Sequence, residues 1–335
     1  MFKKIAIYGA GAIGGWLGAG LAAQGAELSV VARGAALEAL RQCGLRLRDR
    51  SADGQEVETA CAVRTSEEPS ELGVQDLVIV SVKAPGMADV ASRIAPLLGP
   101  DTVVLTAMNG VPWWFLQGFG GMAEGQTLQS VDPGGVIEKA IAPSHVVGCV
   151  VHASCSVDAP GIVRHHFGSG LIIGEPAGGE SPRVRALTEL LRKAGFDATV
   201  SSQIQKDIWF KLWGNMTVNP ISAFTGATAD RIMDDELVRG FVSAVMLEAR
   251  DIGAKIGIPI AQDPEDRHIV TRKLGAFTPS MLQDVRAGKA VEIDALVSAV
   301  RELGQMTQVS TPFTDALLGL ARLHARVHGL YPERT

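Results

Sequence analysis

The sequence predicts an N-terminal α/β domain built on a parallel sheet and a C-terminal domain made only of helices. Apolar strand-like runs alternate with helical segments up to about residue 107, which is typical of a parallel sheet covered by helices on both faces. Later runs over 146–174 look like strands joined by short turns. Helical periodicity dominates from residue 203 onward. The chain of 335 residues is long enough for two domains of about 150 residues each. We therefore expect domains at 1–202 and 203–335.

The pattern assigns each expected element to a stretch of the chain. In the first domain, strands are expected over residues 5–8, 27–32, 76–82, 102–107, 146–153, 161–166, 170–174 and 198–200. Helices are expected there over 13–23, 86–98 and 182–194. In the second domain, helices are expected over 208–218, 235–256, 280–287 and 293–307, and from Pro312 to about His328.

A glycine-rich turn joins the first strand to the first helix. Its sequence is Gly9-Ala10-Gly11-Ala12-Ile13-Gly14. Gly9 permits the tight turn, Gly11 lets the backbone approach a pyrophosphate, and Gly14 lets the helix pack closely on the strand. The N–H groups that begin the helix attract the phosphates. This context predicts a Rossmann-type dinucleotide site, against the alternative of an ordinary glycine-rich turn.

The end of the second strand indicates which dinucleotide binds. An Asp or Glu at this place would bind the ribose 2′-hydroxyl of NAD. No acid immediately follows the strand, and Arg33 stands there instead. A guanidinium suits a 2′-phosphate, so we expect NADP(H). The alternative is that Arg33 is an exposed loop residue without a ligand.

Composition excludes several other classes of function. The net charge of −5 and the lack of a long Lys/Arg run do not favour nucleic-acid binding. The four cysteines form no metal motif, and His165 and His166 would point to opposite faces of a strand, so we expect no metal. Glycines interrupt the apolar stretches, which excludes a signal peptide or membrane span, and a cytoplasmic protein is expected.

A lysine and two asparagines share one stripe of an apolar helix. Lys211, Asn215 and Asn219 are spaced i, i+4, i+8 among large apolar residues. A lysine buried there is costly without a partner, and desolvation makes it a better proton donor near neutrality. The alternative is a lysine that extends from a core helix to solvent.

Several motifs together resemble the ketopantoate reductase (2-dehydropantoate 2-reductase) family over nearly the full length of the chain. The combination S-M-x-Q-D followed by E-I-D is typical of that family. The residues that carry the resemblance are the glycine motif from Gly9 to Gly14, Ser81-Val82-Lys83, Asn109-Gly110, the segment from Lys211 to Pro220, Ser280-Met281-Leu282-Gln283-Asp284 and Glu292-Ile293-Asp294.

The resemblance implies NADPH-dependent reduction of a 2-oxo acid, by default 2-dehydropantoate to pantoate in pantothenate biosynthesis. It implies a second domain like the C-terminal domain of 6-phosphogluconate dehydrogenase. Lys211 would donate the proton and polarise the carbonyl, and Asn109 would touch both cofactor and substrate. The other implied roles are substrate binding by Asn215, Asn219 and Ser280, and cofactor binding by Lys83 and Glu292. As alternatives, Ser280 could be a helix N-cap and Glu292 a surface carboxylate.

Two departures from the family pattern leave the substrate open. The expected Asn-Gly pair after Pro220 is absent, since residues 225–230 contain no Asn. Trp113, Trp114 and Phe115 precede a Gly-rich stretch over 118–135. One hypothesis is that these rings line the substrate mouth and favour a bulkier acid. The alternative is that they anchor the loop to the core or to a subunit interface.

Three functions therefore remain to be compared. The leading one is ketopantoate reduction, and the nearest rival is the same chemistry on another ketone or 2-oxo acid. A non-catalytic NADP-sensing module would not need Lys211 in line with Asn215 and Asn219. The apolar helical domain could also bury a homodimer interface.

Overall fold

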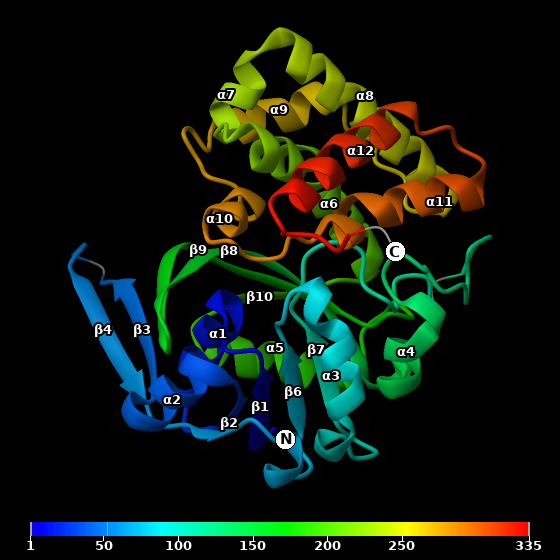
Figure 1. Cartoon of the computed structure of the whole chain (residues 1–335). Coiled ribbons are helices and arrows are strands. Elements are labelled where there is room, and N and C mark those ends of the chain that lie inside the picture. The colour runs from blue at the N-terminus through cyan, green and yellow to red at the C-terminus, as the bar shows by residue number, and fades with distance from the viewer. Residues whose placement is uncertain (1, 52, 119, 334–335) are drawn as a thin grey trace. The chain divides into compact units, whose positions relative to one another are not determined.

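Ten strands form one mixed sheet in this computed structural model, which describes residues 2–51, 53–118 and 120–333 (Figure 1). They are β1 (Lys4–Tyr8), β2 (Glu27–Val31), β3 (Leu45–Arg50), β4 (Glu56–Cys61), β5 (Arg64–Ser66), β6 (Leu77–Val80), β7 (Val103–Thr106), β8 (Val146–Ala159), β9 (Ile162–Gly174) and β10 (Asp197–Val200). Their order across the sheet is β4-β3-β9-β8-β7-β6-β1-β2-β5, and β10 also pairs with β9.

The order of the parallel strands reverses between β1 and β6. Strand β1 pairs with β2 on one side and with β6 on the other, and β7 and β8 continue beyond β6. Helix α1 (Ala12–Ala22) connects β1 to β2, and α3 (Met87–Arg93) lies between β6 and β7. Because parallel crossovers are right-handed, connections that run in opposite directions place α1 and α3 on opposite faces of the sheet. Ligands of such sheets bind at the carboxyl ends of the strands where the order reverses.

The sheet is mixed, because a hairpin extends the parallel strands expected from the sequence. Strands β8 and β9 pair in antiparallel fashion as one long hairpin, so the separate strands expected at 161–166 and 170–174 are a single strand. A short turn through Gly161, whose φ is +74°, reverses the chain between them. An antiparallel pair needs only a tight turn, whereas a parallel pair needs a long crossover.

Strands β3, β4 and β5 and helix α2 (Gly34–Cys43) were not expected from the sequence. Charged residues alternate along β3 and β4 and pair across the strands, as between Arg48 Nε and Glu58 Oε2 at 2.7 Å. Residues 45–48, Leu-Arg-Leu-Arg, alternate between apolar and charged side chains, which is typical of a half-buried strand, so the sequence carried a signal for β3 that our prediction did not use. The short helix α4 (Val136–Ala140) was also not expected from the sequence.

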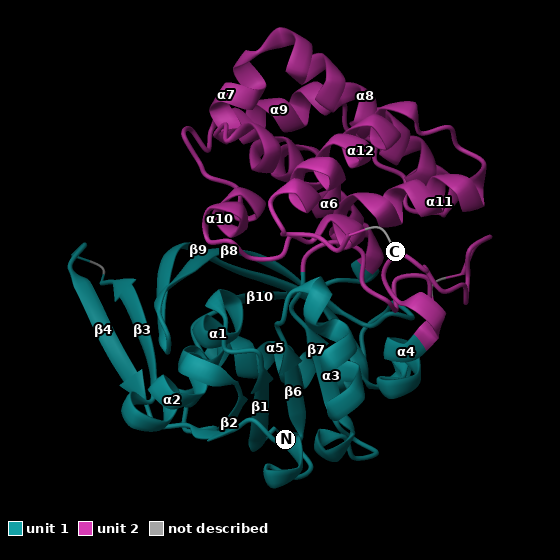
Figure 2. Ribbon diagram, viewed as in Figure 1, with its two compact units in different colours: residues 1–108, 136–204 teal, residues 109–135, 205–335 magenta. Residues whose placement is uncertain are grey.

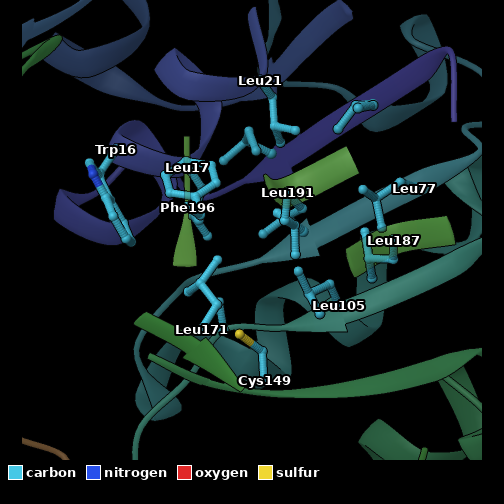
Figure 3. Close-up of a cluster of buried hydrophobic side chains, with 14 of the residues drawn as sticks. Trp16, Leu17, Leu21, Leu77, Leu105, Cys149, Leu171, Leu187, Leu191 and Phe196 are labelled. Carbon is cyan, nitrogen blue, oxygen red and sulfur yellow. The ribbon is translucent and has the colours of Figure 1, made fainter. Parts of the chain in front are cut away.

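A buried apolar cluster joins α1 and α5 (Pro182–Lys193) to one face of the sheet (Figure 3). Leu17 and Leu21 from α1 and Leu187 and Leu191 from α5 contribute to this cluster. The ring of Trp16 packs edge-on against Phe196 with centroids 4.7 Å apart. This packing holds the start of α1 firmly against β1 and therefore positions the glycine loop between them.

The remaining long segments are helical. They are α6 (Ile204–Thr225), α7 (Ala229–Asp234), α8 (Glu236–Lys255), α9 (Pro264–Arg272), α10 (Ser280–Arg286), a π-helical turn (Asp294–Ser298), α11 (Ala299–Thr307) and α12 (Pro312–Val327). The five helices expected here are present, whereas α7 and α9 were not expected. In the part of the chain described, no helix has the length and apolar character needed to cross a membrane.

The chain divides into two compact units (Figure 2). Unit 1 comprises residues 1–108 and 136–204, and unit 2 comprises residues 109–135 and 205–335. The division at residue 204 lies near the expected boundary, but residues 109–135, which we expected in the first domain, belong to unit 2. Interactions such as the ring contact between Phe115 and Trp209, with centroids 6.0 Å apart, join that segment to α6.

Candidate active site

The glycine loop of unit 1 has little space for side chains. Gly9 has a φ of +98°, and a Cβ atom there would lie 2.6 Å from Val82 Cγ1. A Cβ atom on Gly14 would overlap the carbonyl oxygen of Gly9 and the hydroxyl of Ser81. The Ser81 hydroxyl donates a hydrogen bond to the Gly9 carbonyl at 2.8 Å. Ser81 thus ties the loop to the end of β6, at the place where the strand order reverses.

Gly11 differs from Gly9 and Gly14 because a Cβ atom there would meet no protein atom within 4 Å. It occupies the N-cap position of α1, where no side chain caps the helix and the first turn contains no acid. The open space and the positive end of the helix dipole suit a pyrophosphate. The loop from Gly9 through Ala10, Ala12 and Ile13 to Gly14 therefore fits the phosphates of a dinucleotide.

Arg33 lies at the end of β2, next to this loop. The backbone N–H of Gly9 donates to Val31 O at 3.3 Å, which links the loop to β2. Arg33 is the N-cap residue of α2, and its side chain is 71% exposed. Its Nη1 atom lies 3.7 Å from Asp89 Oδ2 on α3. A carboxylate this close partly neutralises the cation that we expected to bind the 2′-phosphate.

Lys83 follows β6 at the same edge of the sheet. It is exposed and precedes a short 3₁₀ turn over Ala84–Gly86. Lys83 thus lies at the carboxyl end of β6, where a ligand of unit 1 is expected.

Lys211 and Asn109 meet within unit 2. The Nζ atom of Lys211 donates a hydrogen bond to Asn109 Oδ1 at 2.8 Å. Lys211 is half-buried on α6, where Leu212 and Trp213 beside it are almost fully buried. Because the amide oxygen accepts the hydrogen bond, the ammonium is held in one direction despite its long side chain. The sequence predicted both residues, and the structure brings them together.

The segment that carries Asn109 is fixed to the π-helical turn. The backbone N–H of Val111 donates to Ala295 O at 2.8 Å. Gly110 has a φ of +80°, and a Cβ atom there would lie 2.6 Å from the same oxygen. A π-turn frequently marks a functional site, because it presents a carbonyl group outside the regular helix ladder. Here that carbonyl positions the residue that follows Asn109-Gly110.

Glu292 lies two residues before this turn and is only 8% exposed, so its interpretation as a surface carboxylate is wrong. Nearby, Asp294 Oδ1 accepts hydrogen bonds from Ser298 at 2.8 Å and from Tyr331 at 2.7 Å. Burial, together with the hydrogen bond to Asp294, raises the pKa of Tyr331 to about 12. Tyr331 therefore stays protonated at neutral pH and acts as a permanent donor that stabilises the turn.

The three residues expected to bind substrate differ in exposure. Asn215 is half-buried one turn after Lys211, and Asn219 is 6% exposed another turn on. Ser280 is the first residue of α10 and is exposed. The N-cap position belongs to Pro279, so the alternative role of Ser280 as an N-cap is wrong.

The aromatic segment after Asn109 is fully enclosed. Trp113 is 2% exposed, and Trp114 and Phe115 are 0% exposed. This burial favours the alternative in which the rings anchor the loop, rather than the hypothesis that they line the substrate mouth.

The adjacent histidines have separate partners. His165 bonds with Asp49 at 3.0 Å, and His166 bonds with the hydroxyl of Ser156 at 2.9 Å. The ring of His165 also stacks on Trp16 with centroids 5.5 Å apart. These contacts explain both side chains without a shared ligand.

The fold and these residues define a class of two-domain oxidoreductases that have a Rossmann-type nucleotide-binding domain and a helical domain. Residues 5–113 match the family model "Ketopantoate reductase PanE/ApbA", and residues 203–325 match "Ketopantoate reductase PanE/ApbA C terminal". The chain belongs to the ketopantoate reductase family. Enzymes of this family use NADPH and act on a CH–OH group.

Individual relatives cover the whole length of the chain. A 2-dehydropantoate 2-reductase of Mesorhizobium japonicum is 47% identical over 98% of this chain and 99% of its own. A solved structure from Ralstonia solanacearum MolK2, provisionally assigned as a ketopantoate reductase, has 54% identity and a TM-score of 0.93 over 99% of this chain and 100% of its own. A PanE/ApbA family ketopantoate reductase from Ralstonia eutropha JMP134 has 26% identity and a TM-score of 0.82 over 97% of this chain and 99% of its own.

Sequence reasoning missed one charged residue near Lys211. Arg267 of α9 packs on α6 beside Phe210 and Gly214. The segment around it, Pro264-Glu265-Asp266-Arg267-His268, looks like the polar start of an ordinary surface helix. No motif in the sequence could have identified Arg267, because its position depends on the packing of α9 against α6.

Proposed function

We propose that this protein reduces 2-dehydropantoate to pantoate with NADPH, and that Lys211 supplies the proton. The observation that carries the proposal is the hydrogen bond of 2.8 Å from Lys211 Nζ to Asn109 Oδ1, at a half-buried position of α6. A non-catalytic NADP sensor would not need a lysine held in this way. The relative from Mesorhizobium japonicum, whose name states this reaction, supports the choice of substrate.

The nicotinamide of bound NADPH supplies the hydride to the keto carbon. As the carbonyl oxygen gains negative charge, the Lys211 ammonium stabilises that charge and donates a proton to it. Asn109 keeps the ammonium oriented, and such preorganisation avoids the cost of reorientation during the reaction. The ketone thus becomes a secondary alcohol, with the hydride on carbon and the lysine proton on oxygen.

We infer further roles for the residues around this pair. Asn215 and Asn219 follow Lys211 along α6, where their amides can hydrogen-bond polar groups of the substrate, and Ser280 adds a hydroxyl. The loop from Gly9 to Gly14, with Arg33 and Lys83, is proposed to hold the cofactor phosphates. Glu292 is proposed to contact the ribose of the cofactor. The open space at Gly11 and the uncapped start of α1 support the phosphate assignment.

The test is NADPH oxidation, followed by its absorbance, against a panel of 2-oxo acids with NADH in parallel. We expect the highest kcat/KM with 2-dehydropantoate and NADPH. A higher value for another 2-oxo acid would replace the substrate in this proposal. A lack of turnover with every acid would reject the enzymatic function altogether.

A further inference from the structure

Arg267 is a largely buried cation without an acidic partner among the residues that the structure describes. Its Nε atom is enclosed and has no hydrogen-bond partner. Within the described residues no hydrogen bond or ion pair occupies the terminal nitrogens Nη1 and Nη2, and neither atom is enclosed. The outer edge of the guanidinium is therefore available to a ligand. Burial also lowers the pKa of Arg267 from its usual value.

The guanidinium packs against α6, on the turns that also carry the proposed proton donor. Its Cζ atom is 5.4 Å from the centre of the Phe210 ring. A Cβ atom on Gly214 would be 2.7 Å from Nε, so the glycine makes room for the arginine. Phe210 and Gly214 are spaced i, i+4 and share one face of α6, and Gly214 follows Lys211 by three residues, so this face adjoins the Lys211 stripe. A second cation is thus placed beside the lysine stripe.

An anion at the open edge of the guanidinium would offset part of the cost of burying its inner edge. Removing a charge from water without pairing it is costly, and a single cation–π contact offsets only part of that cost. Arg272 on the same helix is paired in this way, since its Nε atom lies 3.8 Å from Asp234 Oδ1. Arg267 has no such carboxylate among the described residues of unit 2, although a guanidinium is well suited to bind one through two parallel hydrogen bonds.

We propose that Arg267 binds the carboxylate of the 2-oxo acid substrate and so selects acids over neutral ketones. This inference rests on the proposed function, because it takes the substrate to carry a carboxylate next to the carbonyl group that Lys211 protonates. Arg267 would thus bind the carboxylate, and Lys211 would protonate the carbonyl oxygen. Arg267 is then a specificity-determining residue.

The main test compares Arg267→Gln with Arg272→Gln, which removes the same charge from the same helix. Each variant is assayed with the 2-oxo acid and with the 2-oxo amide in which a carboxamide replaces the carboxylate. For Arg267→Gln we expect kcat/KM for the acid to fall about 10- to 100-fold, the range typical of a lost charge-assisted hydrogen bond. Its value for the amide should change less than threefold, and Arg272→Gln should resemble the wild type. An unchanged preference for the acid over the amide in Arg267→Gln would overturn the proposal.

A second variant keeps the charge of Arg267 but shifts its position. Gly214→Ala inserts a Cβ atom against Arg267 Nε, so the guanidinium must shift while the net charge and the helix are kept. We expect the same loss of preference for the acid, and the better helix propensity of Ala offsets part of the cost of the close contact. Retained preference in a folded Gly214→Ala protein would count against the proposed position of the carboxylate.

Binding measurements separate this inference from the proposed function. Calorimetric titration of the NADP⁺ complex with pantoate reports recognition of the carboxylate without turnover. If the wild type binds pantoate and Arg267→Gln does not, the inference holds even where no acid is reduced. Equal binding by both proteins would reject it, even if ketopantoate reduction is demonstrated.

Discussion

The Nζ atom of Lys211 and the Oδ1 atom of Asn109 lie 2.8 Å apart, although 102 residues separate them in the chain. Lys211 comes from the middle of α6, and Asn109 comes from the segment that Val111 fixes to the π-helical turn through Ala295. Two distant parts of the sequence are thus combined into one proton-donating group within unit 2.

We expect Lys211→Ala to lower kcat by about 100- to 10,000-fold, as is typical for loss of a general acid. The dissociation constant for NADPH, measured by fluorescence titration, should change less than threefold. Lys206→Ala is the matched control, because Lys206 is an exposed lysine on the same helix. Equal losses of turnover and NADPH affinity would contradict a role as proton donor.

Asn109→Ala should lower kcat less than Lys211→Ala does, because it removes the residue that orients the ammonium and leaves the ammonium itself. An effect of about 10- to 100-fold corresponds to the loss of one charge-assisted hydrogen bond. The double variant should be no slower than Lys211→Ala alone, since the two groups act as a unit. Additive losses in the steady-state assay would show that they act independently.

Two glycines of the phosphate loop should respond differently to the same substitution. Gly14→Ala places a Cβ atom against Gly9 and Ser81, so we expect a lower melting temperature as well as weaker NADPH binding. Gly11→Ala meets no protein atom, so the melting temperature should be preserved while NADPH affinity falls at least 10-fold. Normal NADPH affinity in Gly11→Ala would show that no phosphate approaches this residue.

Asp89 is expected to moderate the preference for NADPH over NADH. Its carboxylate lies 3.7 Å from Arg33 and would repel a 2′-phosphate bound there. Because both side chains are largely exposed, the effect is small, and Asp89→Asn should raise the ratio of NADPH to NADH affinity about threefold, since exposed pairs contribute up to about 1 kcal/mol. Arg33→Ala should lower the same ratio, and Arg41→Ala on the following helix is the control. Unchanged ratios in both variants would show that the 2′-phosphate binds elsewhere.

The aromatic segment is expected to contribute stability and not specificity. Trp114→Ala should lower the free energy of unfolding by about 3–5 kcal/mol, as is typical for large core aromatics. The milder Phe115→Leu should fold and keep the substrate profile of the wild type. A changed preference among 2-oxo acids in Phe115→Leu would restore the hypothesis that these rings line the substrate mouth.

Acid should weaken one ion pair of unit 1. Burial opposes ionisation of Glu175, but hydrogen bonds from Arg183 and Ser181 outweigh it and lower the pKa of Glu175. Arg183 Nε lies 2.7 Å from Glu175 Oε1 and Nη2 lies 2.5 Å from Oε2. A carboxyl whose pKa is lowered by folding stabilises the protein above its unfolded pKa, and this stability is lost as the pH falls toward the folded pKa.

Glu175→Gln should therefore lower the free energy of unfolding by about 2 kcal/mol at neutral pH, between the values for exposed and buried pairs. The difference from the wild type should shrink below the unfolded pKa of the glutamate. Urea unfolding across a pH series measures both effects. A difference that stays constant with pH would exclude the ionised pair as its source.

The sequence by itself determined the features that depend on neighbours along the chain. The strand before Gly9, the helix after it and the stripe of Lys211, Asn215 and Asn219 follow from periodicities of two and 3.6 residues and from glycine spacing. These local patterns predicted the two kinds of domain, the glycine loop and the Lys211 stripe, whereas the roles of Lys83, Ser280 and Glu292 came only from the family resemblance. Motif order added the family resemblance, which the comparisons with known proteins confirm.

Only the tertiary structure decided which distant residues meet. It joined residues 109–135 to the helical unit, placed Asn109 against Lys211, buried Glu292 and the three adjacent aromatics, and set Arg267 against Gly214. Side-chain packing between segments far apart in sequence leaves no periodic trace in either segment. For this reason a glycine in α6 and an arginine in α9 carried no signal until the fold brought them together.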